Sequence, residues 1–352
     1  MKVGIVGFSG AGKTTIFNAL TGLQAEVGPH GRRGKANLGM ITVPDPRVEA
    51  LAQLYQPKRV AFAKVEFVDL IGPTQSSSSA GSSLGAEAIA PMREADALVQ
   101  VVCGFANPAL ADEAEPARDL RAFEDELILT DLIQIEKRLE RLKKEAKKGR
   151  EPELLQRCQV QLEAGQPLRR LELAGEDRQL INGFRFLSQK PFLALLNSAE
   201  PLTDEAVDPA FVQAATADQL AWLTICGQEE MEIAQLDAEA QLEFLRDLGL
   251  QEPASHRFIR AAYQLLDLIS FLTAGSDECR AWPIKRGTTA LKAAGKIHSD
   301  IERGFIRAEV VAFDDFIALG SEARCREAGK LRLEGKNYPV RDGDIIHFRF
   351  NV

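Results

Sequence analysis

The chain has 352 residues, of which 45% are hydrophobic and 27% charged, a composition typical of a globular protein with enough residues for two or three domains. It contains no run near the ~20 apolar residues that a membrane-spanning helix needs, and no export signal precedes its first predicted strand, so we expect a cytoplasmic protein without a membrane partner. The net charge of −8 disfavours attraction of nucleic acid to the whole surface, and no DNA partner is predicted, although a local basic patch could still bind RNA.

Short apolar runs bounded by turn residues are typical of buried parallel strands. They are Lys2–Val6, Lys64–Val68, Ala97–Val102, Phe192–Leu196 and Trp222–Ile225. Helical stretches lie between several of them. The sequence therefore predicts a doubly wound, mostly parallel α/β sheet that holds its ligand beyond the carboxyl ends of the strands.

The first of these strands leads directly into the segment Gly7–Thr14, which fits the phosphate-binding pattern GxxxxGK[ST] and is followed by a helical run. Its glycines let backbone amides converge on phosphate oxygens, and the helix presents its positive end to them. We expect Lys13 to reach the β and γ phosphates and the Thr14 hydroxyl to bind Mg²⁺. The predicted nucleotide contacts in this loop are Ser9, Gly10, Ala11, Gly12, Lys13, Thr14 and Thr15.

The second strand ends in a DxxG pattern formed by Asp69 and Gly72. In a GTPase-like protein this spacing places the carboxylate at the metal and the glycine amide near the γ-phosphate, whereas an Asp that only starts a turn is the alternative. The position of the pattern, on the next major strand after a phosphate loop, favours the functional interpretation. We therefore predict Lys13, Asp69 and Gly72 as catalytic residues, with Thr14 and Asp69 at the metal.

A long charged segment follows the third strand, and its apolar residues are spaced four, three, four and three, the pattern of a heptad seam. They are Ile128, Leu132, Ile135, Leu139 and Leu142. The pattern breaks at Gly149–Pro152, resumes at Leu155 and stops at Gly165–Pro167, which predicts an antiparallel helical hairpin; a plain helical pair packed on the domain is the alternative. The basic residues between Lys137 and Lys148 are the best local candidate for contact with RNA.

The fourth strand leads into Asn197–Glu200, where a GTPase would carry its NKxD motif. The Asp of that motif accepts two hydrogen bonds from guanine. Glu200 in the place of Asp and Ser198 in the place of Lys therefore make adenine plausible beside guanine. We expect Asn197, Ser198 and Glu200 to contact the base.

The end of the chain changes in character. From about Ala274, short β-like segments separated by turn signals predict a small β-rich domain that closes with Ile345–Phe350. The serine-rich segment Gln75–Gly85 has little to bury, so we expect it to be mobile.

The order of these parts, together with several segments near the C-terminus, resembles the YchF / Obg-like ATPase family across nearly the whole chain. The segments are Arg260–Tyr263, Phe271–Gly275, Ile297–Asp300, Gly304–Val310 and Asp342–Val352, with Val43–Arg47 similar to the family's segment after the first switch. The resemblance implies a P-loop NTPase domain at 1–117 and 177–266, an inserted coiled-coil hairpin at 118–176, and a small β-grasp-like TGS domain at 267–352.

The resemblance also implies a function. It implies that ATP is preferred over GTP through an N-x-x-E base motif, carried here by Asn197 and Glu200. It implies slow hydrolysis, because in this family a hydrophobic residue replaces the glutamine that positions water in Ras-like GTPases. Finally, it implies association with ribosomes or RNA, through the hairpin and the TGS-like domain, or with stress responses.

The chain departs from the family pattern in both switch regions and looks like a divergent member. Pro73 follows the DxxG pattern where the family has Leu-Val-Lys, and Arg33 aligns with the metal-binding threonine of the first switch. One expected Mg²⁺ contact is therefore missing. The segment Ile225–Glu229 stands where the family has Ser-Ala-Lys, on the far side of the base pocket.

The leading hypothesis is a slow Mg²⁺-dependent ATPase switch. Two alternatives stay open: a nucleotide-gated binding module that has lost hydrolysis, and a GTPase that prefers GTP. A small-molecule kinase is disfavoured because kinases lack the hairpin and the TGS-like domain at these places. Arg32, Arg33 or Lys35 could supply the charge of an arginine finger, although a solvated basic loop is the favoured interpretation.

Overall fold

The structure is a computed structural model that describes residues 1–23, 25, 37–70, 84–107, 113–146, 148–247 and 252–351. It divides the chain into two compact units. The first unit comprises Met1–Met40 and Glu66–Phe258, and the second comprises Ile41–Val65 and Ile259–Val352. Among the described residues, every helix is too short or too polar to span a lipid bilayer.

The sheet of the first unit has the strand order β2-β4-β1-β5-β6-β7. Its strands are β1 (Lys2–Val6), β2 (Asn37–Thr42), β4 (Lys64–Asp69), β5 (Ala97–Cys103), β6 (Phe192–Asn197) and β7 (Ala221–Ile225). The neighbours from β4 to β7 pair in parallel. Every side chain of β5 and β6 is buried because helices cover both faces of the sheet. The predicted α/β sheet is confirmed, and all the strands predicted from apolar runs lie in it.

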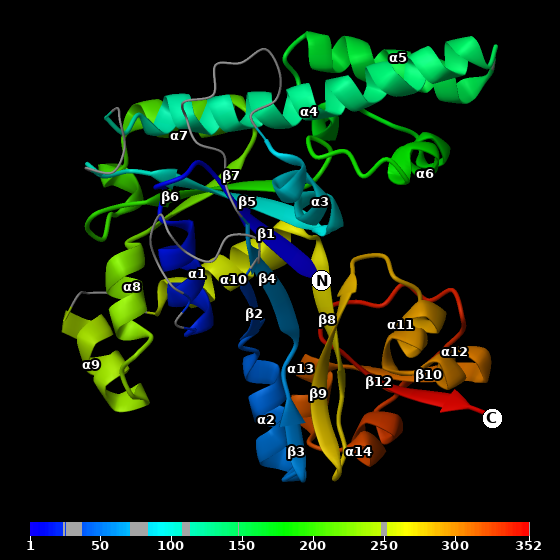
Figure 1. Ribbon diagram of the computed structural model, residues 1–352. Coiled ribbons are helices and arrows are strands. Elements are labelled where there is room, and N and C mark those ends of the chain that lie inside the picture. The colour runs from blue at the N-terminus through cyan, green and yellow to red at the C-terminus, as the bar shows by residue number, and fades with distance from the viewer. Residues whose placement is uncertain are drawn as a thin grey trace. The chain divides into compact units, whose positions relative to one another are not determined.

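Helices cover the two faces of this sheet (Figure 1). The helices that belong wholly or in part to this unit are α1 (Lys13–Thr21), α3 (Ala86–Glu94), α4 (Pro116–Lys144), α5 (Arg150–Glu163), α6 (Gly175–Asn182), α7 (Pro209–Ala217), α8 (Gly227–Ile233), α9 (Ala238–Asp247) and α10 (Ala254–Leu265), with 3₁₀ turns at Leu168–Arg170 and Asp204–Ala206. Side chains of α3, α4 and α7 share one buried apolar cluster with the strands. On the opposite face, Phe258 of α10 packs on Phe67 of β4 at a ring distance of 5.3 Å.

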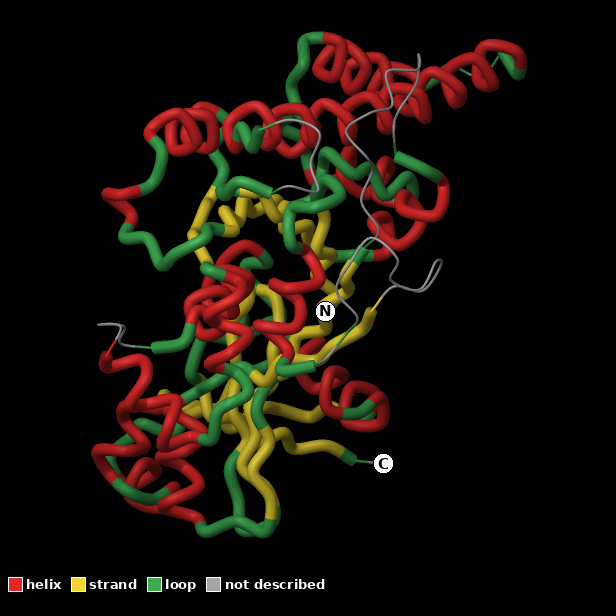
Figure 2. Tube along the Cα trace, turned by 60° about the vertical axis from the view of Figure 1, so that its left-hand side comes forward, coloured by secondary structure: helices red, strands yellow, loops and turns green. Residues whose placement is uncertain are grey.

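The long helix α4 belongs to two different cores. Its first half packs into the α/β core through Leu120, Phe123 and Leu127. Its second half lies alongside α5 (Figure 1 and Figure 2), and the predicted seam forms the core between them. That core contains Ile128, Ile135, Leu142, Leu155, Cys158 and Leu162, with Leu132 and Leu139 partly buried against it. The helical hairpin is therefore confirmed.

One detail of the hairpin prediction is wrong. The break between the helices lies earlier than Gly149–Pro152, because α4 ends at Lys144 and α5 already begins at Arg150 and includes Pro152. Proline is tolerated there, since the amides of a helix's first turn have no partner within the helix and the missing N–H costs nothing.

A buried carboxylate fixes the root of the hairpin. Asp131 of α4 is fully buried and accepts hydrogen bonds from the Leu187 amide at 2.9 Å and from the amide and hydroxyl of Ser188, both at 2.7 Å. Burial raises the pKa of Asp131 to about 6, although the three donors favour its charged form. The chain that returns from the hairpin toward β6 is thus tied to the middle of α4.

The second unit has a sheet of strand order β11-β10-β12-β8-β9-β3. Its elements are α2 (Pro46–Tyr55), β3 (Arg59–Ala61), β8 (Leu268–Thr273), β9 (Glu278–Lys285), α11 (Ala290–Ile297), α12 (Ser299–Arg303), β10 (Phe305–Ala312), α13 (Phe313–Leu319), α14 (Glu322–Glu327), β11 (Arg332–Glu334) and β12 (Asp344–Phe350). The first and last strands of the C-terminal segment, β8 and β12, pair in parallel at its centre, and α11 packs on one face. This is the predicted β-grasp arrangement.

Residues 41–65 belong to this second unit, whereas the predicted boundary placed them in the NTPase domain. Strand β3 pairs in parallel with β9, and Val48 and Leu51 of α2 join the core on the sheet face opposite α11. Asp45 caps α2 by accepting from the Arg47 amide at 3.0 Å, and the Arg47 side chain binds Asp342 at 3.0 Å. The predicted domain boundaries themselves stay predictions.

Replacing Asp131 by Asn should lower the free energy of unfolding by about 1–3 kcal/mol, because the amide substitutes donors for an acceptor and leaves a buried backbone N–H without a partner. Urea denaturation at neutral pH measures this. Glu136→Gln is the matched control, since Glu136 is exposed on the same helix and its variant should stay within about 0.5 kcal/mol of the parent. Equal stabilities of the two variants would contradict the anchoring role of Asp131.

Candidate nucleotide-binding site

The phosphate loop joins the end of β1 to the start of α1. Gly7, Gly10 and Gly12 adopt positive φ angles of 134°, 86° and 86°. At Gly7 there is also no room for a side chain, because a Cβ atom would lie 2.4 Å from the Val101 carbonyl oxygen. No side chain caps the N-terminus of α1, so the amides of its first turn face the position that a phosphate would take. The predicted contact residues from Ser9 to Thr15 lie in the loop and in this first turn.

Lys13 is held inside the loop in this structure. Its ammonium group donates to the Phe8 carbonyl oxygen at 2.8 Å. Burial lowers the pKa of Lys13 to about 8, and the negative charge of Asp69 offsets part of this effect. Because the pKa of Lys13 lies close to neutral pH, a bound polyphosphate would stabilise the charged form of this lysine.

Thr14 and Asp69 meet at the end of the loop. The Thr14 hydroxyl donates to the Asp69 carboxylate at 2.8 Å, and Asp69, the last residue of β4, is only 7% exposed. The fold implies a divalent cation at this place, and the donor set fits Mg²⁺, because hydroxyl and carboxylate oxygens are the hard ligands that this ion prefers. The structure thus brings together two predicted metal-site residues that are separated by 55 positions in the sequence.

Asn197 ends β6 next to the phosphate loop. Its amide nitrogen donates to the Ala11 carbonyl oxygen at 3.0 Å, and its amide oxygen accepts from the Gly227 backbone at 3.1 Å. A Cβ atom on Gly12 would lie 2.2 Å from the same amide nitrogen, so only glycine permits this approach. The side chain of Asn197, a predicted base residue, therefore links the phosphate loop to the start of α8.

The other two predicted base residues differ in exposure. Ser198 is buried, and its hydroxyl donates to the Glu200 carbonyl oxygen at 2.6 Å. Glu200 is exposed. Glu229 of α8 lies near it, and burial, the charge of Glu232 and the charge of Glu200 together raise the pKa of Glu229. A second carboxylate thus lies near the base motif, and Glu229 carried no assigned role in the sequence.

Two asparagines of the site were missed in the sequence. Asn37 of β2 donates to the Asp69 carboxylate at 3.1 Å, and Asn107 donates to the Gly10 carbonyl oxygen at 2.9 Å. Neither stands in a motif, and each acts through a contact that only the fold creates.

Some predicted residues lie outside the described part of the chain. These are Gly72 and Pro73 of the DxxG region, the basic residues Arg32, Arg33 and Lys35, and the serine-rich segment up to residue 83. Their predicted roles stay predictions.

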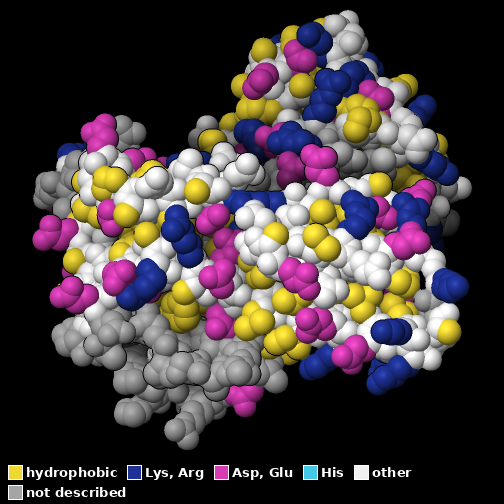
Figure 3. Space-filling model, turned by 90° about the horizontal axis from the view of Figure 1, so that it is seen from above, with side chains coloured by type: hydrophobic (Ala, Val, Ile, Leu, Met, Phe, Trp, Pro, Cys, Tyr) yellow, Lys and Arg dark blue, Asp and Glu magenta, His cyan; other side chains and the backbone are white. Residues whose placement is uncertain are grey.

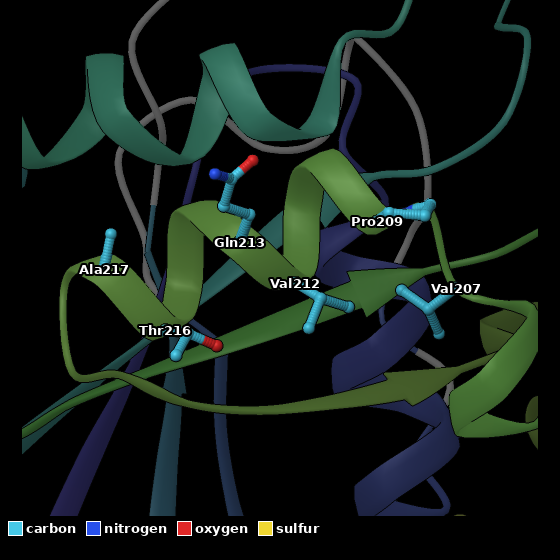
Figure 4. A pocket seen from close by; sticks show the side chains of 6 residues that line it. All are labelled: Val207, Pro209, Val212, Gln213, Thr216 and Ala217. Carbon is cyan, nitrogen blue, oxygen red and sulfur yellow. The ribbon is translucent and has the colours of Figure 1, made fainter.

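A depression on α7 offers no competing chemistry (Figure 4). Its lining residues are Val207, Pro209, Val212, Gln213, Thr216 and Ala217. None of these six side chains is charged, so the depression has no group that could neutralise a phosphate or bind a metal. This depression is therefore not a second candidate for a phosphate or metal site.

Comparison with known proteins shows the family of the chain. Residues 268–351 match the model of the C-terminal domain of YchF-type GTPases, described as a protein of unknown function, and residues 2–150 match the model described as a 50S ribosome-binding GTPase. The ribosome-binding ATPase YchF of Pasteurella multocida is 42% identical to the chain over 367 aligned residues, which cover 100% of this chain and 99% of that protein. The chain belongs to the YchF family. The YchF protein of Bacillus subtilis is 38% identical with full coverage of both chains.

A solved YchF structure shares the fold. The YchF GTPase of Schizosaccharomyces pombe superposes with a TM-score of 0.84 at 27% identity, covering 99% of this chain and 97% of that one. The whole YchF architecture is therefore present, including the P-loop domain, the helical hairpin and the C-terminal domain. The resemblance seen in the sequence is confirmed.

The lowered pKa of Lys13 predicts a pH dependence of nucleotide binding in this YchF family member. Bound phosphates favour the charged ammonium and raise its pKa above 8, so binding takes up a proton above that pH. The affinity for Mg·ATP should be flat below about pH 7.5 and fall by up to tenfold per pH unit above pH 8. Isothermal titration in two buffers of different ionisation enthalpy measures both affinity and proton uptake.

Lys13→Arg is the control for this titration, because a guanidinium stays charged throughout the range. Its affinity should be independent of pH even if it is lower. A parent protein whose affinity does not change between pH 7.5 and 9.5 would show that the prediction is wrong.

Proposed function

We propose that this protein is a Mg²⁺-dependent ATPase switch with slow turnover that associates with the ribosome. The observation that carries the proposal is the grouping of Lys13, Thr14 and Asp69 at one end of the phosphate loop. An ammonium, a hydroxyl and a carboxylate are the groups that a Mg·triphosphate requires.

Each side chain has a distinct task in this proposal. Lys13 leaves the Phe8 carbonyl and pairs with the β and γ phosphates, while the backbone amides at the start of α1 bind phosphate oxygens. Thr14 and Asp69 hold Mg²⁺, directly or through its water. When bound, the ion neutralises charge on the β and γ phosphates.

The proposed preference for adenine rests on the base side of the site. Ser198 is too short to cover a base as the lysine of NKxD does. Glu200 replaces the Asp that accepts two hydrogen bonds from guanine, and its longer side chain changes the geometry of those two bonds. The single amino group of adenine can still donate to Glu200 or to its neighbour Glu229. The curated relatives from Pasteurella and Bacillus are named ATPases, whereas the Schizosaccharomyces structure is titled a GTPase, so the choice between nucleotides needs a direct measurement.

The proposed slow hydrolysis rests on membership of the YchF family, in which a hydrophobic residue replaces the glutamine that positions water in Ras-like GTPases. A binding module that retains ATP is the rival function, favoured by the arginine at the position of the switch threonine.

We expect Mg·ATP to bind more tightly than Mg·GTP by at least about tenfold, and bound ATP to release phosphate far more slowly than the roughly 10 s⁻¹ of a median enzyme. Titration calorimetry followed by a single-turnover assay with radiolabelled nucleotide tests both expectations. Lys13→Ala is the control for a contaminating ATPase and should release no phosphate. Tighter GTP binding would make the protein a GTPase, and intact ATP after many hours would make it a binding module.

Ribosome association is proposed on two grounds. The relatives are named ribosome-binding, and the N-terminal family model carries the same description. The tip of the hairpin also exposes cations, namely Arg141, Lys143, Lys144 and Lys148. In the view from above, basic side chains are interspersed with acidic ones, so the attraction to RNA should be local (Figure 3).

Reversing two charges at the hairpin tip should weaken binding to purified ribosomes by about tenfold or more and flatten its salt dependence, since each lost phosphate contact removes roughly one unit of the salt slope. The variant is Lys143→Glu with Lys144→Glu, measured by co-sedimentation. The control is Lys58→Glu with Lys64→Glu, which changes the net charge equally at two exposed lysines elsewhere. An equal loss in both variants would show a general charge effect and contradict docking by the tip.

A further inference from the structure

The carboxylate at the metal site has a second partner besides Thr14. The same Asp69 oxygen accepts from the Thr14 hydroxyl at 2.8 Å and from the Asn37 side-chain amide at 3.1 Å. Two donors on one oxygen fix the rotation of a carboxylate more firmly than either does alone. The orientation of Asp69 therefore depends on a residue of β2 as well as on the phosphate loop.

The position of Asn37 is set by the packing of β2 on α1. Gly39 lies against the last turn of α1, where a Cβ atom would be 2.4 Å from Thr21 and 3.0 Å from Phe17. Residues two apart in a strand point to the same face and are spaced about 6.6 Å along it. Asn37 is therefore directed to the same side as Gly39, but nearer the start of α1, where Thr14 lies.

The polar contact of Asn37 is not needed to hold the strand in place. Its neighbours Leu38 and Met40 are 59% and 69% exposed and bury little surface, whereas Gly39 and the buried Ile41 carry the packing of β2. A half-buried amide that points at the metal-site carboxylate is better explained by what it does to that carboxylate.

We propose that Asn37 is a positioning residue of the Mg²⁺ site, which holds the Asp69 carboxylate in the orientation that binds the ion or its water. The inference rests on the proposed function. Partners that orient a metal-binding carboxylate typically contribute 10–100-fold to metal affinity. Arg33 stands where the family has the metal-binding threonine, and Asn37 gives the strand that follows the first switch a different connection to the metal site.

The test is the Mg²⁺ dependence of nucleotide release rather than turnover. The full chain is loaded with a fluorescent ATP analogue, and its dissociation rate is followed from excess EDTA to saturating Mg²⁺. For Asn37→Ala, the Mg²⁺ concentration at the midpoint should rise by about 10–100-fold. The rate in EDTA should equal that of the parent, because the phosphate loop is unchanged.

Two further variants make the result specific. Leu38→Ala alters the adjacent, exposed side chain of the same strand and should keep the parent midpoint. Asn37→Gln keeps an amide donor and should shift the midpoint less than Asn37→Ala does. If Asn37→Ala does not fold, Asn37→Ser takes its place, since its hydroxyl is too short to reach Asp69 directly.

The outcomes separate the inference from the proposed function. A parent protein that binds no nucleotide, or whose release ignores Mg²⁺, overturns the proposed function. A Mg²⁺-sensitive parent with an unchanged Asn37→Ala midpoint overturns the role of Asn37 alone. The role of Asn37 is also overturned if Asn37→Ala speeds nucleotide dissociation in EDTA as much as it does in Mg²⁺. It is overturned as well if Asn37→Gln shifts the Mg²⁺ midpoint as far as Asn37→Ala does.

Discussion

The arrangement of the site depends on one buried side-chain amide. Asn197 bonds to the phosphate loop at Ala11 and to the start of α8 at Gly227, while its backbone carbonyl accepts from Gly104 at 2.8 Å. Glycines stand wherever these segments approach it, because a Cβ on Gly12, Gly104 or Gly227 would come within 3.1 Å of an Asn197 atom. One residue thereby aligns the loops that follow four parallel strands, and the phosphate loop receives its shape from this alignment.

The electrostatics of the site follow from that rigid frame. Lys13 is half-buried and Asp69 is buried, and these opposite charges each have a neutral partner, the Phe8 carbonyl and the Thr14 hydroxyl. In a low-dielectric environment such charges interact strongly with any ion that enters. A phosphate attracts Lys13 and a cation attracts Asp69. Each side chain therefore gives up a neutral contact within the protein and gains a contact with a charged ligand. The frame needs little rearrangement for this exchange, which keeps the cost of reorganisation low.

The parts of the structure that could be predicted were those marked by a pattern of residues close together in the sequence. Continuous apolar runs predicted β1, β4, β5, β6 and β7. Strand β2 was missed because its sequence alternates between buried and exposed residues and contains Gly39. The phosphate loop and Asp69 were found because their spacing is short. Asn37 was missed because its contact joins residues 32 positions apart through strand pairing. The pairing of β3 with β9 has no local signal, because β3 has three residues and β9 lies more than 200 positions further along the chain.

The continuity of α4 has a mechanical consequence. A single helix of 29 residues runs from the core of the sheet to the hairpin tip without a break, and α5 stiffens its outer half. The portion beyond Ile128 is about 24 Å long at 1.5 Å per residue, so a tilt of about 10° at its root displaces the tip by roughly 4 Å. The geometry of the hairpin would therefore magnify at its tip any small tilt at its root. Asp131 lies close to the point of α4 where the hairpin leaves the core of the sheet.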